Sequence, residues 1–264
     1  MDRLQQDELW QTFHRFQKSR EKIYGPKINN ALKSQANQFL EGINNNYTYT
    51  QALDLVTSKT MYEALKPLYL DAGIVYGAKH LAYLKRQKAR LPIGFNALMI
   101  ELLNQYFNID LLNTVEEITG YSKELLRNIF LRAIPLGLSI SEITQQIEEV
   151  GFTYNRSRLI ARTETVVAAN TGAMLAAQTT GLKLNKVWIA ARDNRTRRIP
   201  RNRYDHLHMD GVIVPKESAF TVTGEVMMQP GDGKNGAKAG NICNCRCTIG
   251  FIPLRNKDGR LLKL

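Results

Sequence analysis

Residues 155–181 read NRSRLIARTETVVAANTGAMLAAQTTG, and this stretch decides the fold class. Its apolar side chains recur at helical spacing, Asn155 can cap a helix, and Gly181 is a typical helix stop. The predicted helix over residues 155–180 would be roughly 40 Å long at a rise of about 1.5 Å per residue. Because alanine and glycine fill its second half, we expect another element to approach it closely.

Short apolar runs of the kind found in strands follow Gly181. These runs are residues 187–190, 212–214 and 247–252. Glycine, proline, asparagine and charged residues separate them. We therefore predict an α+β protein, in which a mainly helical N-terminal region precedes a small C-terminal α+β unit with short strands and long loops.

The N-terminal half carries helical periodicity throughout. Predicted helices cover residues 4–23, 28–43, 50–56, 95–106, 111–119, 123–133 and 140–150, together with a long helix that ends near residue 87. Ser139 and Glu142 fit a capping box at the start of the helix over 140–150. We place a domain boundary after residue 120, which gives a helical region of residues 1–120 and a C-terminal domain of residues 121–264.

Prolines and glycines mark several predicted helix ends. Gly25 and Pro26 are expected to stop the first helix, and Pro67 to kink the long helix or mark a restart within it. Residues 91–94, Leu-Pro-Ile-Gly, are expected to break the chain. The basic run 85–90 would place cations at the negative end of the long helix, which is a sufficient structural reason for that run.

Large aromatic side chains are frequent in the predicted N-terminal helices. We expect several to be exposed, beyond what a small helical bundle can bury: Trp10, Phe13, Phe16, Tyr69 and Tyr76. Such a surface would serve contacts with another protein or with copies of the same chain.

The net charge of +12 is unevenly distributed. Residues 1–150 hold 17 Lys and Arg against 16 Asp and Glu, a net of +1, whereas residues 151–264 hold 19 against 8, a net of +11. A nearby polyanion, either nucleic acid or an acidic protein, would explain this asymmetry, and a solvated basic face is the alternative. Because no apolar run reaches the roughly 18 residues of a membrane span, we expect a soluble protein made in a cytoplasm.

All three cysteines lie close together, at Cys243, Cys245 and Cys247. Their alternating spacing predicts one face of a strand, with steps of about 7 Å. An odd, clustered count argues against a disulfide framework and for a reduced chain.

Histidines and cysteines offer the nitrogen and sulfur ligands that zinc prefers. The candidate ligands are His206, His208, Cys243, Cys245 and Cys247, of which His206, His208, Cys245 and Cys247 are favoured. The usual two-residue spacing between ligands is missing, however, and free cysteines are often small buried apolar residues. We expect no cofactor, with zinc as the alternative.

Several short motifs follow one another in the second half of the chain. They are Ile160-Ala161-Arg162-Thr163-Glu164-Thr165, Trp188, Asp193-Asn194-Arg195-Thr196-Arg197, His206, Asp210-Gly211, Phe220, Pro230-Gly231-Asp232 and Asn244-Cys245-Arg246-Cys247. In this order the sequence resembles the phage head morphogenesis family, also called the Mu protein F-like minor head proteins. It departs from the family pattern by extra residues around 199–203. The resemblance implies a structural signature made of Arg162, Glu164, Asp193, Arg195, Arg197, His206, Asp210, Cys245, Arg246 and Cys247.

The resemblance implies a function as well. It points to a minor head protein of a tailed bacteriophage, without enzymatic activity, that acts in head morphogenesis and in DNA packaging or ejection. The implied partners are the portal protein, the major capsid or scaffold protein, and DNA through non-specific phosphate contacts. The implied location is the virion, in the head interior or at the portal vertex, after assembly in the host cytoplasm.

Five arginines occur within residues 195–203. In one interpretation Asp193 and Asp210 hold neighbouring guanidinium groups in a structural acid–guanidinium lattice. In the other, arginines contact DNA phosphates or an acidic partner. The candidates for that contact are Arg197, Arg198, Arg201 and Arg203.

Enzymatic interpretations have less support in the sequence. Glu164, His206 and His208 could serve as base and acid of a metal-dependent nuclease or other hydrolase. The sequence contains no nucleophile elbow, metal-binding carboxylate cluster or phosphate cradle, so we expect no catalytic residues. A zinc-stabilised nucleic-acid-binding module is the second alternative.

Overall fold

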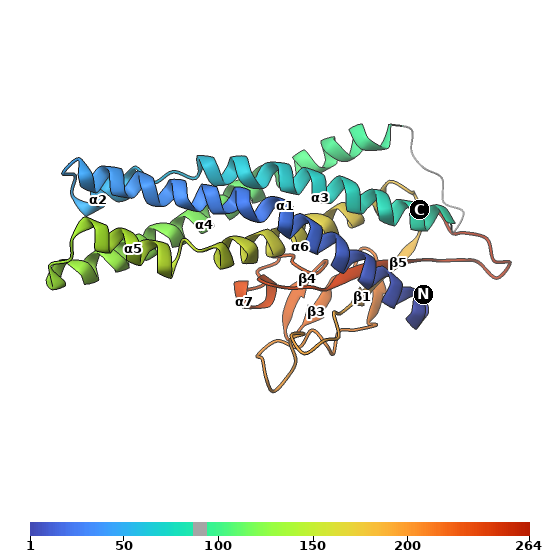
Figure 1. Ribbon diagram of the computed structural model, residues 1–264. Coiled ribbons are helices and arrows are strands. Elements are labelled where there is room, and N and C mark those ends of the chain that lie inside the picture. Colours follow the sequence, from blue (N-terminus) through green and yellow to red (C-terminus); the bar gives the residue numbers. More distant parts are fainter. Residues whose placement is uncertain (87–93) are drawn as a thin grey trace. The chain divides into compact units, whose positions relative to one another are not determined.

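The computed structural model describes residues 1–86 and 94–264 and confirms the α+β class (Figure 1). The helices are α1 (Arg3–Asn44), α2 (Tyr49–Asp54), α3 (Lys59–Arg86), α4 (Phe95–Ala133), the 3₁₀ turn η1 (Ile134–Leu136), α5 (Ile140–Val150), α6 (Tyr154–Gln178) and the short α7 (Ala239–Ile242). The strands are β1 (Leu184–Ile189), β2 (Ile213–Pro215), β3 (Phe220–Val222), β4 (Glu225–Met227) and β5 (Thr248–Pro253). None of the helices among these residues is long and apolar enough to cross a bilayer.

Two compact units make up the chain. Unit 1 contains Met1–Arg20, Leu68–Gln105 and Arg162–Leu264, and unit 2 contains Glu21–Pro67 and Tyr106–Ala161. Helices α1, α3, α4 and α6 each contribute residues to both units. The domain boundary that the sequence places after residue 120 falls inside α4 and stays a prediction.

A three-stranded antiparallel sheet with the order β2-β1-β5 forms the strand layer of unit 1. Its central strand β1 is almost wholly buried and pairs Trp188 with Ile249. Strands β3 and β4 form a separate hairpin that was not predicted from the sequence. Its two-residue turn, Thr223-Gly224, has φ of 49° and 83°, the left-handed conformation that tight hairpins require.

Aromatic side chains of α1 and α3 lie in the core of unit 1. The rings of Phe13 and Phe16 lie 5.1 and 5.4 Å from that of Tyr76. The expected exposure is therefore wrong for Phe13, Phe16, Tyr69 and Tyr76, which are at most 5% exposed, while Trp10 is half-buried. These side chains are buried because the start of α1 belongs to the same unit as the C-terminal strands, a contact that local sequence does not reveal.

Small residues bring α3 and α6 together within unit 1, as the composition of residues 155–181 predicts. A Cβ atom placed on Gly172 would lie 2.1 Å from the carbonyl oxygen of Gly73. One placed on Gly77 would lie 2.8 Å from the carbonyl oxygen of Gly172. The helix backbones therefore meet at a distance that only glycine permits at these positions.

Unit 2 is an all-helical assembly with its own core. Phe39 is fully buried and meets Phe130 edge to face, with ring centroids 5.7 Å apart. Gln35, also fully buried, donates a hydrogen bond to the Thr119 hydroxyl over 2.9 Å. The capping box predicted at Ser139 and Glu142 is confirmed, with both reciprocal hydrogen bonds present.

The helices are longer than their proline and glycine content predicts. Helix α1 continues through Pro26, α3 continues through Pro67, and residues 95–133 form one helix rather than three. A proline inside a helix costs about 3 kcal/mol. In unit 2, buried residues on both sides of Pro26, Tyr24 and Ile28, supply packing that offsets this cost.

The predicted cap is wrong for the start of α6, whereas the predicted basic end of α3 is present. Helix α6 begins at Tyr154, so Asn155 is not its cap, and the Thr153 hydroxyl accepts the Arg156 N–H instead. Lys85 and Arg86 end α3 as expected. Residues 87–90 of the basic run and residues 91–93 of the predicted break lie outside the described residues.

Candidate functional site

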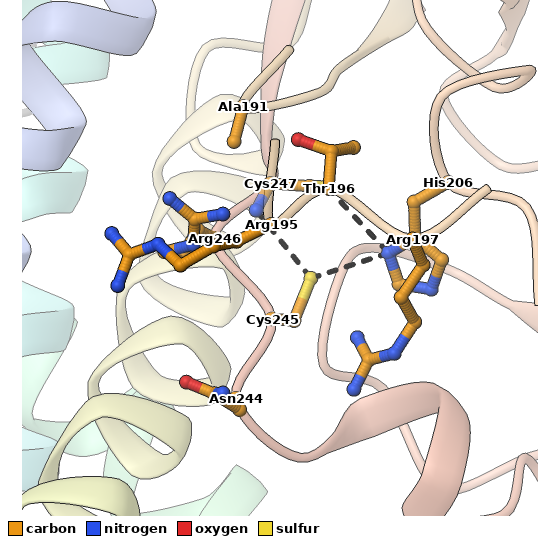
Figure 2. A pocket seen from close by; sticks show the side chains of 9 residues that line it. All are labelled: Ala191, Arg195, Thr196, Arg197, His206, Asn244, Cys245, Arg246 and Cys247. Atoms are coloured by element: carbon orange, nitrogen blue, oxygen red, sulfur yellow. Dashed lines mark hydrogen bonds between the residues drawn. The ribbon is translucent and has the colours of Figure 1, made fainter. Parts of the chain in front are cut away.

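His206, Cys245 and Cys247 form a buried cluster in unit 1 (Figure 2). The His206 Nδ1 atom lies 3.5 Å from the Cys245 Sγ and 3.6 Å from the Cys247 Sγ. All three residues are at most 2% exposed. Within the described part of the chain, no other group of three such ligands lies close enough to hold a metal ion.

The cysteines reach this cluster through a turn and not through a strand. Cys243 caps the end of α7, Asn244 has a left-handed φ of 59°, and β5 begins only at Thr248. The prediction that Cys243, Cys245 and Cys247 lie on one face of a strand is therefore wrong. Asparagine tolerates the left-handed conformation, and this turn directs the side chains of Cys245 and Cys247 inward.

Hydrogen bonds fix the orientation of the His206 ring. Its Nε2 lies 2.6 Å from the Asn241 Oδ1 atom. The Asn241 amide nitrogen donates to the Glu225 carboxylate and to the Val222 carbonyl, so its oxygen must face the histidine. Nε2 therefore carries a proton and donates it to Asn241, which leaves Nδ1 as the atom that faces the two sulfurs.

The cluster perturbs the pKa of each of its members. The pKa of Cys245 is well below its ordinary value, because the Cys247 thiol donates a hydrogen bond to it and His206 lies beside it, although burial acts the other way. The Cys247 pKa is raised, because that hydrogen bond and burial both favour its thiol. Burial would lower the His206 pKa, but the Cys245 charge and the hydrogen bonds that the ring donates to Cys245 and Asn241 raise it.

An ion pair lies next to the cluster. Both guanidinium ends of Arg246 contact the Asp193 carboxylate, and the Arg246 side chain is 5% exposed. The hydrogen bonds from Arg246 hold the Asp193 pKa well below its usual range, although burial acts the other way. Asp193 also accepts the Arg195 N–H and the Thr196 hydroxyl, so it organises the loop that follows β1.

Helix α6 holds the cysteine segment from one side. Arg162 donates to the Asn244 side chain over 2.6 Å, and the Thr163 hydroxyl accepts the Asn244 N–H over 2.9 Å. Glu164 instead accepts the hydroxyl proton of Tyr69 on α3. Arg162 therefore joins α6 to the loops, whereas Glu164 joins it to another helix.

The predicted lattice of acids and arginines is present at Asp193, through Arg246, whereas Asp210 has other partners. Asp210 pairs with Arg3 over 2.6 Å and with Arg192 over 3.4 Å, neither of which the sequence analysis singled out. It also accepts the Ala190 N–H. Arg3 is 207 positions away from Asp210, so no local motif could have identified this pair.

The arginines of residues 195–203 divide into two groups. The Arg197 guanidinium points inward and donates to the Cys243 carbonyl. Arg201 and Arg203 are exposed, Arg198 is half-buried, and Arg203 lies over the Tyr204 ring at 5.7 Å. Three of the four arginines predicted for polyanion contact thus remain accessible.

His208 lies outside the cluster. It is exposed, and its backbone N–H donates to the Asp205 carboxylate. His208 therefore does not act as a fourth ligand beside His206, Cys245 and Cys247. The cluster instead borders a cavity of about 10 Å³ (Figure 2). The cavity is lined by Ala191, Arg195, Thr196, Arg197, His206, Asn244, Cys245, Arg246 and Cys247. That volume holds about one water molecule.

Comparison with known proteins matches the region around this site to a family model. Residues 124–250 match the family model described as phage Mu protein F like protein, which confirms the resemblance seen in the sequence. Over 181 residues, 61% of this chain, the sequence is 28% identical to NAD(+)–arginine ADP-ribosyltransferase EFV of Enterococcus faecalis. The chain spans 35% of that protein's length. No solved structure matches the chain.

Proposed function

Because residues 124–250 form a phage Mu protein F-like domain and the chain is a phage head-related protein, we propose that it is a minor head protein that associates with the portal during head assembly. The family match carries this proposal. It covers the loops, helix α6 and strands that surround the cysteine cluster. The role we propose is structural, in head morphogenesis, with the virion as the final location.

Unit 2 offers a surface for contact with other head proteins. Leu131, Ile134 and Leu136 are 44%, 56% and 70% exposed at the turn from α4 to α5. Large aliphatic side chains grouped at a surface favour contact with another protein. We assign the portal contact to these three residues and not to the buried aromatic residues of α1 and α3.

Unit 1 offers a surface for DNA or an acidic partner. Arg198, Arg201 and Arg203 lie in one loop, and residues 151–264 carry a net charge of +11. Phosphate contacts by such side chains carry no sequence information, so binding would be independent of DNA sequence. This contact would suit a protein that ends beside packaged DNA.

Two alternative functions are enzymatic, ADP-ribosyl transfer and metal-dependent DNA cleavage, and both can be assayed directly. The name of the Enterococcus faecalis relative gives an ADP-ribosyltransferase activity, but this chain spans only 35% of that protein. We expect the purified chain to transfer no ADP-ribose from NAD to arginine substrates, and to cleave no DNA with Mg²⁺, Mn²⁺ or Zn²⁺ present. Activity in either assay, lost on substitution of Glu164 or His206, would replace the structural proposal.

Assembly of heads tests the main proposal. Portal, scaffold and major capsid proteins of the source phage would be produced with and without this chain, and procapsids purified by sedimentation. We expect the chain to sediment with procapsids only when portal is present, and its deletion to lower the yield of infectious particles. Absence of the chain from both procapsids and virions, with unchanged infectivity on deletion, would overturn the proposal.

A further inference from the structure

We propose that His206, Cys245 and Cys247 bind a zinc ion, with a water molecule as the fourth ligand. The cluster supplies one nitrogen and two sulfurs, a ligand set that zinc accepts. This proposal does not rest on the role in head assembly, and each can fail without the other.

The spacing of the ligand atoms is the first argument. Tetrahedral zinc with bonds of about 2.3 Å to sulfur and 2.0–2.1 Å to nitrogen separates a nitrogen from a sulfur ligand by about 3.5–3.6 Å. The Nδ1 atom of His206 lies 3.5 and 3.6 Å from the two sulfurs. All three ligand atoms lie within 4.8 Å of one another. The two nitrogen–sulfur separations therefore match those of a tetrahedral zinc site.

The hydrogen bonds around the cluster are the second argument. Asn241 accepts the Nε2 proton of His206, so the lone pair of neutral Nδ1 can bind a metal. The Cys247 N–H donates to the Cys245 sulfur over 3.4 Å, and the Ala191 backbone hydrogen-bonds to the Cys247 sulfur. Each ligand thus has a partner that orients it, as ligands in zinc sites usually do.

The charge of the cysteine ligands and the cavity beside them also favour a bound zinc ion. Zinc binding would require both cysteines as thiolates, and Zn²⁺ would balance their two charges in this buried site. The nearby Arg246 is already paired with Asp193. The adjacent cavity has room for about one water molecule, which supplies the fourth position that the protein leaves open.

Zinc would join segments that are distant in sequence. His206 lies in the loop after β1, and the cysteines lie just before β5. The cysteine segment also contacts α6 through Asn244 and α1 through the Gln17 side chain. The metal would therefore stabilise unit 1, where few strands hold long loops.

Metal analysis of the purified full chain tests the site. We expect stoichiometric zinc in protein prepared without chelator. Zinc should be lost from Cys245→Ser, Cys247→Ser and His206→Ala. The matched controls Cys243→Ser and His208→Ala change the same residue types outside the cluster and should retain it. Zinc that persists in His206→Ala/Cys245→Ser/Cys247→Ser would overturn the assignment.

Because these variants can fail to fold, the wild-type protein gives an independent readout. Exchange of zinc for Co²⁺ should produce thiolate-to-cobalt charge-transfer bands and the visible bands of a tetrahedral ion. Chelation should lower the melting temperature by at least about 5 °C, and added zinc should restore it. A metal-free, folded protein whose melting temperature does not respond to zinc would contradict the proposal. So would a Cys245–Cys247 disulfide in protein prepared without reductant.

Discussion

The indole Nε1 of Trp10 donates a hydrogen bond to the backbone carbonyl of Arg246, across 3.2 Å and 236 positions of sequence. Gln17, about two turns further along the same face of α1, donates to the neighbouring carbonyl of Cys245 over 3.2 Å. The first helix therefore satisfies two backbone acceptors of the cysteine segment. An N-terminal truncation would damage this segment, so docking by the N-terminal region has to be tested with point substitutions.

The Gln17 contact predicts a loss of stability. Gln17→Leu should lower the melting temperature by about 2–8 °C, because a buried carbonyl left unpaired costs about 1–3 kcal/mol. Gln11→Leu, an exposed site on the same helix, should have little effect. Calorimetry of both variants makes the comparison, and equal melting temperatures would show that the Gln17 contact contributes nothing.

The close approach of α3 and α6 predicts opposite effects at two glycines. Gly172→Ala should destabilise the protein by about 1–3 kcal/mol or more, because its Cβ would collide with the backbone of Gly73. A Cβ at Gly120 of α4 would meet nothing within 4 Å. Gly120→Ala should therefore stabilise by up to about 1 kcal/mol through helix propensity. Denaturant titrations measure both, and a neutral Gly172→Ala would contradict the helix contact.

The Asp193–Arg246 pair predicts that the difference in stability between wild type and Asp193→Asn depends on pH. Since the Asp193 pKa is lower in the folded than in the unfolded chain, its contribution to stability is present above about pH 4 and is lost as pH falls further. Asp193→Asn should therefore destabilise the protein at pH 7, where Arg246 loses its counter-ion, and the difference from wild type should shrink toward pH 3. Asp54→Asn, an exposed site of unit 2, serves as control. A difference that is the same at both pH values would exclude this ion pair as its cause.

The arginine loop predicts salt-dependent DNA binding. Arg198→Ala/Arg201→Ala/Arg203→Ala should weaken binding equally for unrelated sequences and reduce the slope of log K against log salt by up to about 2.7, at about 0.9 per phosphate contact. Lys257→Ala/Arg260→Ala/Lys263→Ala removes the same charge from exposed positions elsewhere in unit 1. Should both triple variants behave alike in a mobility-shift assay, net charge and not this loop would account for binding.

The aliphatic residues at the turn from α4 to α5 predict a separable assembly defect. Ile134→Asp/Leu136→Asp should fold with an unchanged melting temperature, because both side chains are already exposed. Its incorporation into procapsids should fall at least about tenfold, since each charge would have to be buried at an apolar contact. Leu264→Asp, at a site that is 71% exposed in unit 1, should be incorporated normally. Normal incorporation of the double variant would place the portal contact elsewhere.

Local signals in the sequence predicted much of the fold. The capping box at Ser139, the small-residue face that includes Gly172, and the sheet strands β1, β2 and β5 all follow from patterns a few residues long. The helix end at Pro26 was predicted wrongly, because the packing of neighbouring residues outweighs the local cost of proline. At Pro67 the helix does not restart, since α3 continues through that residue.

The sequence by itself determined the α+β class, the family resemblance and the residue types of the candidate site. Only the tertiary structure decided which of them meet. It brought His206 to Cys245 and Cys247, left His208 exposed, and paired Asp210 with Arg3. The physical reason is that hydrogen bonds, ion pairs and metal ligands act over a few ångströms in space, and the folded chain brings together residues that lie up to 236 positions apart.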